Sequence, residues 1–251
     1  MTSTSQPIAL ITGGGRGLGL ALARGLLSNG WRVVTDARRT GHLAAALPGA
    51  VVVPGDVTDP AHREEFAEVV GAVGSAVGAQ GSAAGGQGSA AGGLGRLDLL
   101  VNNASDLGPS PLPRLEYVPL AAARAVFETN VLAPLALTQR FLPALRASRG
   151  VVVNVSSDAA VEAYEGWGAY GAAKAALDQL SAVLAAEEPE LAVYAVDPGD
   201  MRTEMHQAAV PGEDISDRQE PEAVVPALLR LIATRPPSGR VRAADFAGAP
   251  A

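Results

Sequence analysis

The sequence predicts an α/β domain in which a doubly wound, parallel β-sheet carries helices on both faces. Two features of its 251 residues indicate this fold class. Short runs rich in Val, Leu and Ile alternate with longer segments of helical periodicity, and most of these runs are apolar throughout. Strands that are apolar on both sides are typical of a parallel sheet buried between helices. In addition, a glycine-rich turn directly follows the first run, at the edge where such sheets form their sites.

The expected elements follow one another through short connections. We expect strands over residues 8–11, 32–35, 51–53, 97–101, 151–155, 191–196 and 240–244. We expect helices over residues 18–27, 61–77, 121–145, 169–186 and 222–233. Crossovers between parallel strands are right-handed, so the carboxyl ends of the strands should gather at one edge of the sheet.

The composition restricts the class of protein. The chain contains 48% hydrophobic and 18% charged residues, and its net charge of −7 comes without a cluster of Lys and Arg. We therefore expect no nucleic-acid partner. Because the chain has no cysteine, disulfides, thiolate nucleophiles and cysteine-ligated zinc are excluded. We find no apolar run of membrane-spanning length and no signal-peptide core, and we expect a cytoplasmic protein that binds no membrane.

One segment departs from the alternating pattern. Between residues 78 and 95 the chain is almost entirely Gly, Ala, Ser and Gln, and the heptapeptide QGSAAGG occurs twice, over 80–86 and 87–93. Since it lacks apolar periodicity, we expect a flexible surface insertion. The rest of the pattern predicts a single domain over residues 1–251.

A glycine-rich turn links the first strand to the first helix. Its sequence from Thr12 to Gly19, TGGGRGLG, has the spacing T-G-x-x-x-G-x-G rather than the common G-x-G-x-x-G. Glycine permits a sharp turn and the close approach of a ligand. The following helix offers free N–H groups and the positive end of its dipole. The turn therefore indicates a phosphate site, and a glycine turn without a ligand is the alternative interpretation.

A second group of polar residues lies further along the chain. Tyr170 and Lys174 are four residues apart, hence on one face of a predicted helix, and Ser157 lies thirteen residues before Tyr170. Asn130 lies in the long predicted helix, four residues before Pro134. Proline has no N–H to bond the Asn130 carbonyl, so this helix should kink there. The alternative is that Pro134 only bends the helix around the core.

In order and spacing these motifs resemble those of the classical short-chain dehydrogenases/reductases. Further matches are Asp56-Val57 after the third strand, Asn102-Asn103-Ala104 after the fourth, and Pro198-Gly199 with Thr203 after the sixth. Ser105 stands where the family has glycine, so the backbone there should differ slightly. The resemblance runs from Pro7 to Thr203. It implies an oxidoreductase with a single Rossmann-type sheet of about seven strands in the order 3-2-1-4-5-6-7.

The resemblance also implies which residues act. The family's catalytic residues correspond to Asn130, Ser157, Tyr170 and Lys174. The implied cofactor-binding residues are Gly13, Gly15, Arg16, Gly17, Leu18, Gly19, Arg38, Asp56, Val57, Asn103, Ala104, Tyr170, Lys174, Pro198, Gly199, Met201 and Thr203. No metal is implied.

The end of the second strand bears on the choice of cofactor. NAD-preferring members usually place an acidic residue there to hold the ribose 2′-OH. Counting from Gly30, that position is Ala37, and Asp36 falls one residue early, so its side chain should point to the other face. Arg38 and Arg16 lie where NADP-preferring members carry basic residues, and a guanidinium pairs well with phosphate. We therefore expect NADP(H); the alternative is NAD(H), with Arg38 as a solvated surface charge.

The implied reaction is hydride transfer between nicotinamide and a carbonyl or secondary alcohol. The charge that develops on the oxygen needs hydrogen bonds and a proton, which Ser157 and Tyr170 would provide. An ordinary tyrosine pKa of about 10 is too high near neutrality, so we expect the Lys174 ammonium to lower it. By the resemblance, Lys174 also binds the nicotinamide ribose, and a water on the Asn130 carbonyl would relay protons.

Several points stay open. Residues 201–216 should form a mobile substrate loop, and Glu162, Tyr164 and Trp167 either line the substrate pocket or simply pack. The alternative functions are a non-catalytic NADP(H)-sensing regulator and an NAD-preferring alcohol dehydrogenase. We expect a small-molecule substrate of unknown identity and a homo-oligomer. A dimer would form through helices 121–145 and 169–186, whereas a tetramer is in doubt because the C-terminus lacks the common Asp-Gly-Gly turn.

Overall fold

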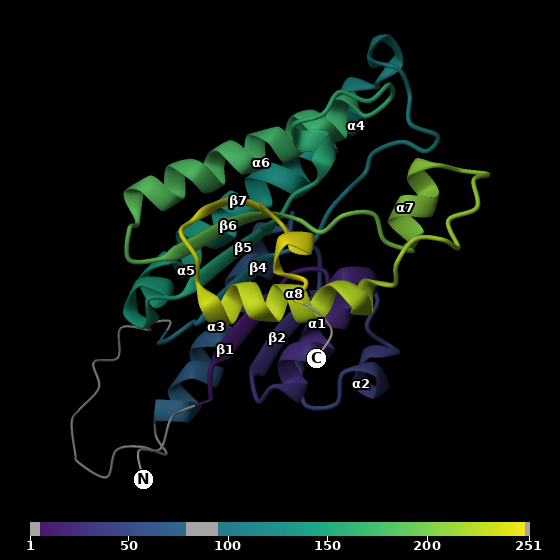
Figure 1. Cartoon of the computed structure of the whole chain (residues 1–251). Coiled ribbons are helices and arrows are strands. Elements are labelled where there is room, and N and C mark those ends of the chain that lie inside the picture. Colours follow the sequence, from purple (N-terminus) through teal and green to yellow (C-terminus); the bar gives the residue numbers. More distant parts are fainter. Residues whose placement is uncertain (1–5, 79–94, 249–251) are drawn as a thin grey trace.

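A seven-stranded parallel sheet forms the centre of the computed structural model, which describes residues 6–78 and 95–248 (Figure 1). The strands are β1 (Ile8–Ile11), β2 (Arg32–Ala37), β3 (Val51–Pro54), β4 (Leu99–Asn102), β5 (Val151–Val155), β6 (Ala192–Asp197) and β7 (Gly239–Arg242). Their order, β3-β2-β1-β4-β5-β6-β7, is the one that the resemblance implied. The order changes direction between β1 and β4, so a crevice lies at the carboxyl ends of these two strands.

Helices cover both faces of the sheet. Of these, α1 (Gly17–Ser28) and α8 (Pro221–Thr234) pack together on one face, and α3 (Pro60–Gly78) and α5 (Ala133–Ser148) pack on the other (Figure 1). The strands separate two cores because alternate side chains point to opposite faces. In β1, Ala9 and Ile11 join the core under α1 and α8, whereas Ile8 and Leu10 join the core under α3 and α5.

The remaining elements lie around this frame. The helices α4 (Leu120–Phe127) and α6 (Gly168–Glu187) pack against each other through Val126 and Ala173. The short helices are α2 (Leu43–Ala46) and α7 (Glu204–Ala209), and the 3-10 turns are η1 (Leu115–Tyr117), η3 (Asp158–Ala160) and η4 (Ala243–Phe246). The expected insertion over residues 78–95 lies, apart from its first and last residue, outside the described residues.

The long helix predicted over residues 121–145 is interrupted at one turn. Between α4 and α5 lies a π-helical turn, η2 (Glu128–Leu132), with Asn130 at its centre. Pro134 stands in the first turn of α5. Because proline removes one N–H from the hydrogen-bond ladder, the interruption falls where that loss predicts it. The predicted distortion at Asn130 is confirmed, and its form is a π-helical turn.

The same helical stretch corrects one expectation. The helical stretch Leu120–Ser148 is 29 residues long and contains an 18-residue window with a mean hydropathy of 1.3, which by length and composition is enough to cross a membrane. The expectation that no apolar run reaches that length was wrong. Leu137, Phe141 and Leu145 of this stretch are buried against the sheet, so packing in the core accounts for the apolar face of α5.

Two other expectations about the C-terminal part need correction. The last strand, expected over residues 240–244, ends at Arg242, and the 3-10 turn η4 follows. The expected loop over residues 201–216 contains the helix α7, which begins after Thr203 because the Thr203 side chain accepts a 3.1 Å hydrogen bond from the His206 N–H. A helix of six residues has too few apolar positions to show periodicity in the sequence.

Candidate active site

Tyr170 and Lys174 lie side by side on α6, near the carboxyl end of β5. The Lys174 Nζ atom is 5.5 Å from the centre of the Tyr170 ring, as their spacing predicted. The same Nζ donates a 2.7 Å hydrogen bond to the Val155 carbonyl, at the last residue of β5. Both side chains are buried. The ammonium is therefore held next to the phenol by the end of a central strand.

Burial controls the protonation of both groups. It raises the pKa of Tyr170 to about 12, although hydrogen bonds with Ser105 and Ser157 act in the opposite direction. Burial lowers the pKa of Lys174 to about 8, partly offset by the negative charge of Asp178. The predicted lowering of the Tyr170 pKa was therefore wrong, because the phenolate loses more by leaving water than its neighbours return. At neutral pH Tyr170 carries its proton.

Ser157 follows β5 and begins the turn η3. Its Oγ accepts a 3.2 Å hydrogen bond from the Ala159 N–H and donates a 2.8 Å hydrogen bond to Asp158 Oδ1. The Asp158 carboxylate also accepts a hydrogen bond of 2.9 Å from the Tyr164 hydroxyl. Burial raises the pKa of Asp158, but the hydrogen bonds from Ser157, Tyr164 and Ala159 lower it on balance. Ser157 thus lies beside an ionised carboxylate that the motif comparison did not include.

Asn130 is fully buried in the π-helical turn and holds the segment that follows β4. Its Oδ1 accepts hydrogen bonds from the Asp106 N–H at 2.8 Å and from Ser105 Oγ at 3.2 Å. Its Nδ2 donates to the Asp106 carbonyl at 2.8 Å. Ser105 also hydrogen-bonds Tyr170, so the serine that replaces the family's glycine joins two of the predicted catalytic residues. The water expected on the Asn130 carbonyl stays a prediction.

The glycine-rich turn lies between β1 and α1, at the crevice. Gly13 and Gly17 have φ angles of +71° and +55°, which glycine adopts more readily than other residues. A Cβ at Gly19 would overlap the Gly13 carbonyl. Arg16, the N-cap of α1, makes no side-chain cap hydrogen bond. The first N–H groups of α1 and the space left by the glycines therefore fit a phosphate group.

Contacts from the neighbouring strand hold the glycine turn in place. Thr12 Oγ1 accepts hydrogen bonds of 3.0 Å from the N–H groups of Asn103 and Ala104, which follow β4. In return, Asn103 Nδ2 donates to the carbonyls of Thr12 at 2.9 Å and Gly13 at 3.2 Å. The two predicted cofactor segments after β1 and β4 are thus one hydrogen-bonded unit.

The end of β2 separates Asp36 from the cofactor edge. Asp36 is buried, and its carboxylate accepts a hydrogen bond from the Gly13 N–H. Ala37, by contrast, lies against Gly15, where a Cβ would be 2.9 Å from the Ala37 side chain. Arg38 is exposed beyond the strand. The side chain of Asp36 therefore points away from the edge that Ala37 and Arg38 border, as the register argument predicted.

Two other predicted cofactor residues have partners in the structure. Arg16 forms an ion pair with Glu204 of α7, and both side chains are largely exposed. Asp56 Oδ1 accepts hydrogen bonds from Thr58, at 2.9 Å from its N–H and 2.8 Å from its hydroxyl. Burial raises the pKa of Asp56, but these bonds and the charge of Arg38 lower it on balance.

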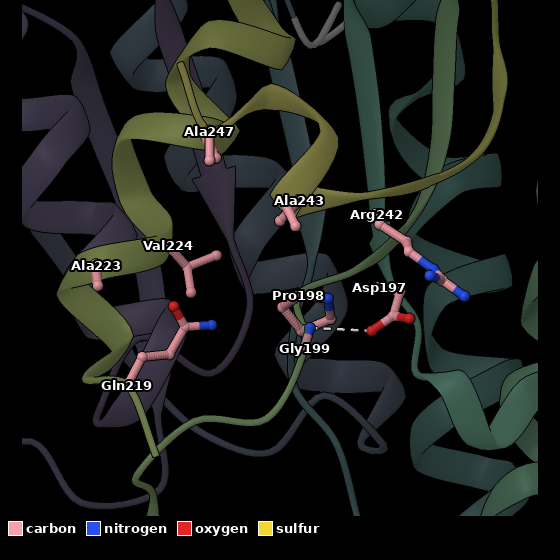
Figure 2. A pocket seen from close by; sticks show the side chains of 11 residues that line it. Asp197, Pro198, Gly199, Gln219, Ala223, Val224, Arg242, Ala243 and Ala247 are labelled. Carbon is pink, nitrogen blue, oxygen red and sulfur yellow. Dashed lines mark hydrogen bonds between the residues drawn. The ribbon is translucent and has the colours of Figure 1, made fainter. Parts of the chain in front are cut away.

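A turn after β6 forms the opposite border of the crevice. Gly199 has a φ of +74°, and its N–H donates a 3.0 Å hydrogen bond to Asp197 Oδ1, drawn as the dashed line in Figure 2. A cavity of about 180 Å³ lies beside Pro198 and Gly199, lined also by residues of α8, β7 and η4 (Figure 2). Its lining does not include the four predicted catalytic residues.

Met201 and Thr203 continue from this turn towards α7. Met201 forms an isolated bridge with Gln219, which ties the start of the 201–216 segment to a residue just after its end. A Cβ placed on Gly17 would lie 3.6 Å from the methyl group of Thr203. The glycine-rich turn and the segment after β6 therefore lie next to each other at Gly17 and Thr203.

An apolar cluster surrounds Tyr170. Ala159 and Ala209 pack with Tyr170, together with the partly buried Trp167 and Met205. The Trp167 ring lies edge-on to Tyr170, with ring centres 5.6 Å apart. Because Met205 and Ala209 belong to α7, this helix covers Tyr170, as expected for a substrate loop. The mobility of that segment stays a prediction.

The structure brings together most of the residues that the sequence singled out. Asn130, Ser157, Tyr170 and Lys174 meet beyond the carboxyl ends of β4 and β5. Leu18 and Val57 have core side chains, so only their backbone can face a cofactor. Sequence reasoning missed the roles of Ser105 and Asp158; the signals were a hydroxyl in place of glycine and a carboxylate directly after Ser157. Within residues 6–78 and 95–248, no group of three or more His, Asp or Glu residues is placed to hold a metal ion.

Comparison with known proteins agrees with this geometry. The sequence matches the short chain dehydrogenase family over residues 7–90 and 87–214. It is 34% identical over 197 residues to the rhamnolipids biosynthesis 3-oxoacyl-(acyl-carrier-protein) reductase of Pseudomonas aeruginosa, which covers 74% of this chain and 68% of that protein. It is 34% identical over 215 residues to sepiapterin reductase of Rattus norvegicus, covering 80% of this chain and 77% of that protein.

A solved relative shows the same fold. A short chain dehydrogenase of Shigella flexneri in complex with NADP superposes with a TM-score of 0.75 at 26% identity, over 94% of this chain and 95% of that chain. The family match spans the glycine-rich turn and the Tyr170–Lys174 pair. This protein is an oxidoreductase that belongs to the short-chain dehydrogenase/reductase family.

Proposed function

We propose that this protein uses NADPH to reduce a small carbonyl compound, with Tyr170 as the proton donor. The observation that carries the proposal is the buried Tyr170 phenol beside Ser157 and Lys174, with its pKa raised to about 12. Carbonyl reduction produces an alkoxide, which needs a proton in the transition state. A tyrosine that keeps its proton through the physiological pH range can supply it.

The neighbouring side chains prepare this transfer. The Ser157 hydroxyl turns from Asp158 to the substrate oxygen and shares the charge that develops there. The Lys174 ammonium, fixed by the Val155 carbonyl, lies 5.5 Å from the Tyr170 ring and favours the phenolate once the proton has left. Asn130 keeps the Ser105 segment in contact with Tyr170. Ser157 thus acts on the substrate oxygen, Lys174 on the phenolate that Tyr170 becomes, and Asn130 on the position of Tyr170's neighbour Ser105.

The crevice fits a nicotinamide dinucleotide. The uncapped N–H groups of α1 and the glycine cradle are suited to its diphosphate. In this proposal Arg38 binds the ribose 2′-phosphate, Lys174 binds the nicotinamide ribose, and the Pro198-Gly199 turn contacts the nicotinamide end. Bound there, the cofactor supplies the hydride. The NADP held by the Shigella flexneri relative supports the choice of NADP(H).

The surroundings of Tyr170 support an apolar substituent on the substrate carbonyl. Trp167, Met205 and Ala209 present apolar surface next to the phenol. Two of the relatives are named as reductases, which supports reduction as the direction of the reaction. We therefore propose ketones and aldehydes with an apolar or aromatic side as the substrate class.

A panel of such carbonyl compounds with NADPH, followed by the loss of cofactor absorbance, tests the proposal. Tyr170→Phe should lower kcat by about 10²–10⁴-fold, because it removes the proton donor and keeps the ring. Tyr117→Phe is the matched control, since Tyr117 is exposed in η1. Full turnover by Tyr170→Phe would refute the role of Tyr170. Tight NADPH binding without turnover of any compound would instead favour a regulator that senses the cofactor.

We further propose that the protein is a homodimer. Leu120, Phe127 and Leu132 on α4 and its continuation, and Val183 on α6, are large apolar residues exposed at the surface. Burying such a surface against a second copy would remove it from water. Light scattering should report twice the monomer mass, and Leu132→Glu should reduce it; a monomeric wild-type protein would exclude this arrangement.

A further inference from the structure

Arg240 joins three segments of the active site from outside the family motifs. It lies on the edge strand β7, and its side chain is three-quarters buried, with 25% exposed. Its Nε donates a 2.9 Å hydrogen bond to Asp178 Oδ2, and its Nη2 donates a 2.8 Å hydrogen bond to the Ser157 carbonyl. The same Nη2 lies 3.6 Å from Asp197 Oδ2. One guanidinium therefore contacts α6, the end of β5 and the end of β6.

Each residue that Arg240 contacts either takes part in the proposed reaction or neighbours a residue that does. Ser157 itself carries the hydroxyl that binds the substrate oxygen. Asp178 lies four residues after Lys174 and thus on the same side of α6. Asp197 accepts the hydrogen bond of the Gly199 N–H through its other oxygen (Figure 2). A planar guanidinium with several donors suits such a junction, because it binds several acceptors in fixed directions.

The charges around Arg240 are unevenly compensated. Asp178 Oδ1 is buried and has no hydrogen-bond partner within the described residues, so its charge depends on the Arg240 ion pair at Oδ2. That charge acts on Lys174 and favours its ammonium form. Lys174 is also faced by the Tyr170 ring on α6 and by the Val155 carbonyl on β5. The negative charges of Asp158 and Asp197 in turn raise the pKa of Tyr170.

We propose that Arg240 is a positioning residue for the reaction: it sets the placement of Ser157 relative to α6 and the Gly199 turn, and it limits the charge that Asp178 exerts on Lys174. The second part needs no turnover to be true, whereas the first rests on the proposed reductase function. Loss of the Arg240 guanidinium should displace the Ser157 hydroxyl. It should also leave the Asp178 carboxylate without its ion pair, one helical turn from Lys174 on α6.

The effect of Arg240 on the charge that Lys174 experiences can be measured directly, because of one feature of the sequence. Lys174 is the only lysine in the chain. Protein labelled with ¹³C-lysine therefore gives one lysine side-chain signal in NMR, and its titration gives the pKa of Lys174. In Arg240→Met this pKa should rise by about half a pH unit or more, because Asp178 then lacks its ion pair. In the double variant Arg240→Met/Asp178→Asn the rise should disappear.

Kinetics measure the first part. Arg240→Met should lower kcat at least about tenfold, since small displacements of a substrate-orienting group are costly. The Kd for NADPH should rise by a smaller factor than kcat falls, because Arg240 reaches the Gly199 turn only through Asp197 and contacts no residue of the glycine-rich turn. Arg240→Lys adds a second lysine signal, so the Lys174 signal is the one shared with the wild-type spectrum. This variant should keep the ion pair with Asp178 and therefore a near wild-type Lys174 pKa, but recover kcat only in part.

Arg146→Met is the matched control. Arg146 also forms an ion pair with a carboxylate at α6, but with Glu188 at the C-terminal end of that helix, 14 residues after Lys174. Its replacement should leave kcat and the Lys174 pKa unchanged. A wild-type kcat and Lys174 pKa in Arg240→Met would overturn the inference, and so would equal losses in both arginine variants. If Arg240→Met does not fold, Arg240→Lys decides: a wild-type kcat there would also overturn it. An inactive wild-type protein with the expected Lys174 titrations would refute the proposed reductase function and the kinetic part, and leave the charge coupling standing.

Discussion

The carboxylate of Asp36 accepts a hydrogen bond from the Gly13 N–H at 2.6 Å. Its other oxygen lies 3.1 Å from Nε2 of His62, and both side chains are 97% buried, with 3% exposed. Asp36 thus supports the glycine-rich turn from within the protein. An acidic residue near the end of the second strand is often taken as a sign of NAD preference, but this one is engaged elsewhere.

Replacing Asp36 should therefore weaken the binding of NADPH and of NADH to the same extent. Asp36→Ala removes the acceptor of the Gly13 N–H and should lower the free energy of unfolding by about 1–3 kcal/mol. In fluorescence titrations, the Kd values of NADPH and NADH should rise by similar factors. Ala37→Asp provides the contrast, because it places a carboxylate on the cofactor edge and should shift the preference towards NADH. A shift of preference in Asp36→Ala would contradict the assignment.

Arg38 should decide between the two cofactors. Charge-assisted hydrogen bonds to phosphate contribute about 1.5–3 kcal/mol, so Arg38→Gln should raise the Kd of NADPH by about 10–150-fold. The Kd of NADH should hardly change. Arg39→Gln, at the next exposed residue, serves as the control and should leave both affinities near wild type. Equal effects of the two substitutions on NADPH would mean that general surface charge, rather than Arg38, attracts the phosphate.

The rate of reduction should fall as the pH rises through about 8. Lys174 has a pKa lowered to about 8 and is charged below that value. Tyr170 keeps its proton up to about 12, so it does not limit the rate in this range. The descending limb of kcat/KM against pH should therefore report Lys174. Lys174→Arg should remove this limb, since a guanidinium stays charged. A rate that increases between pH 7 and 9 would show that the ammonium is not required.

Asn130 should matter for stability as well as activity. Asn130→Ala removes three hydrogen bonds and leaves the Asp106 backbone groups without these partners. We expect the free energy of unfolding in urea to fall by about 2–4 kcal/mol. Asn29→Ala, which removes one exposed hydrogen bond to the Gly25 carbonyl, should cost less than about 1 kcal/mol. Comparable losses in the two variants would show that the buried amide is not a special support.

The parts of the site that sequence could predict depend on local spacing. The face shared by Tyr170 and Lys174 follows from helical periodicity, and the orientation of Asp36 follows from strand alternation. The distortion of the helix at Asn130 follows from one missing N–H at Pro134, although its π-helical form does not. In each case a few neighbouring residues determine the result, and the structure agrees.

The parts that sequence could not predict depend on the whole fold. Arg240 reaches Ser157 across 83 residues of chain, and the spacing within β7 contains no sign of that contact. The predicted lowering of the Tyr170 pKa was wrong because the effect of burial, which comes from the packing of several elements, outweighs that of any single neighbour. The helix α7 was missed because its start depends on one cap at Thr203 rather than on an apolar pattern.

The solitary lysine also determines how this protein responds to amine chemistry. All other basic side chains are arginine or histidine, so a reagent that acylates side-chain amines has one target, and that target lies inside the active site. The amount of label incorporated at Lys174 would count accessible active centres. Protection of Lys174 by NADPH would then give the fraction of occupied sites, with no substrate and no measurement of turnover.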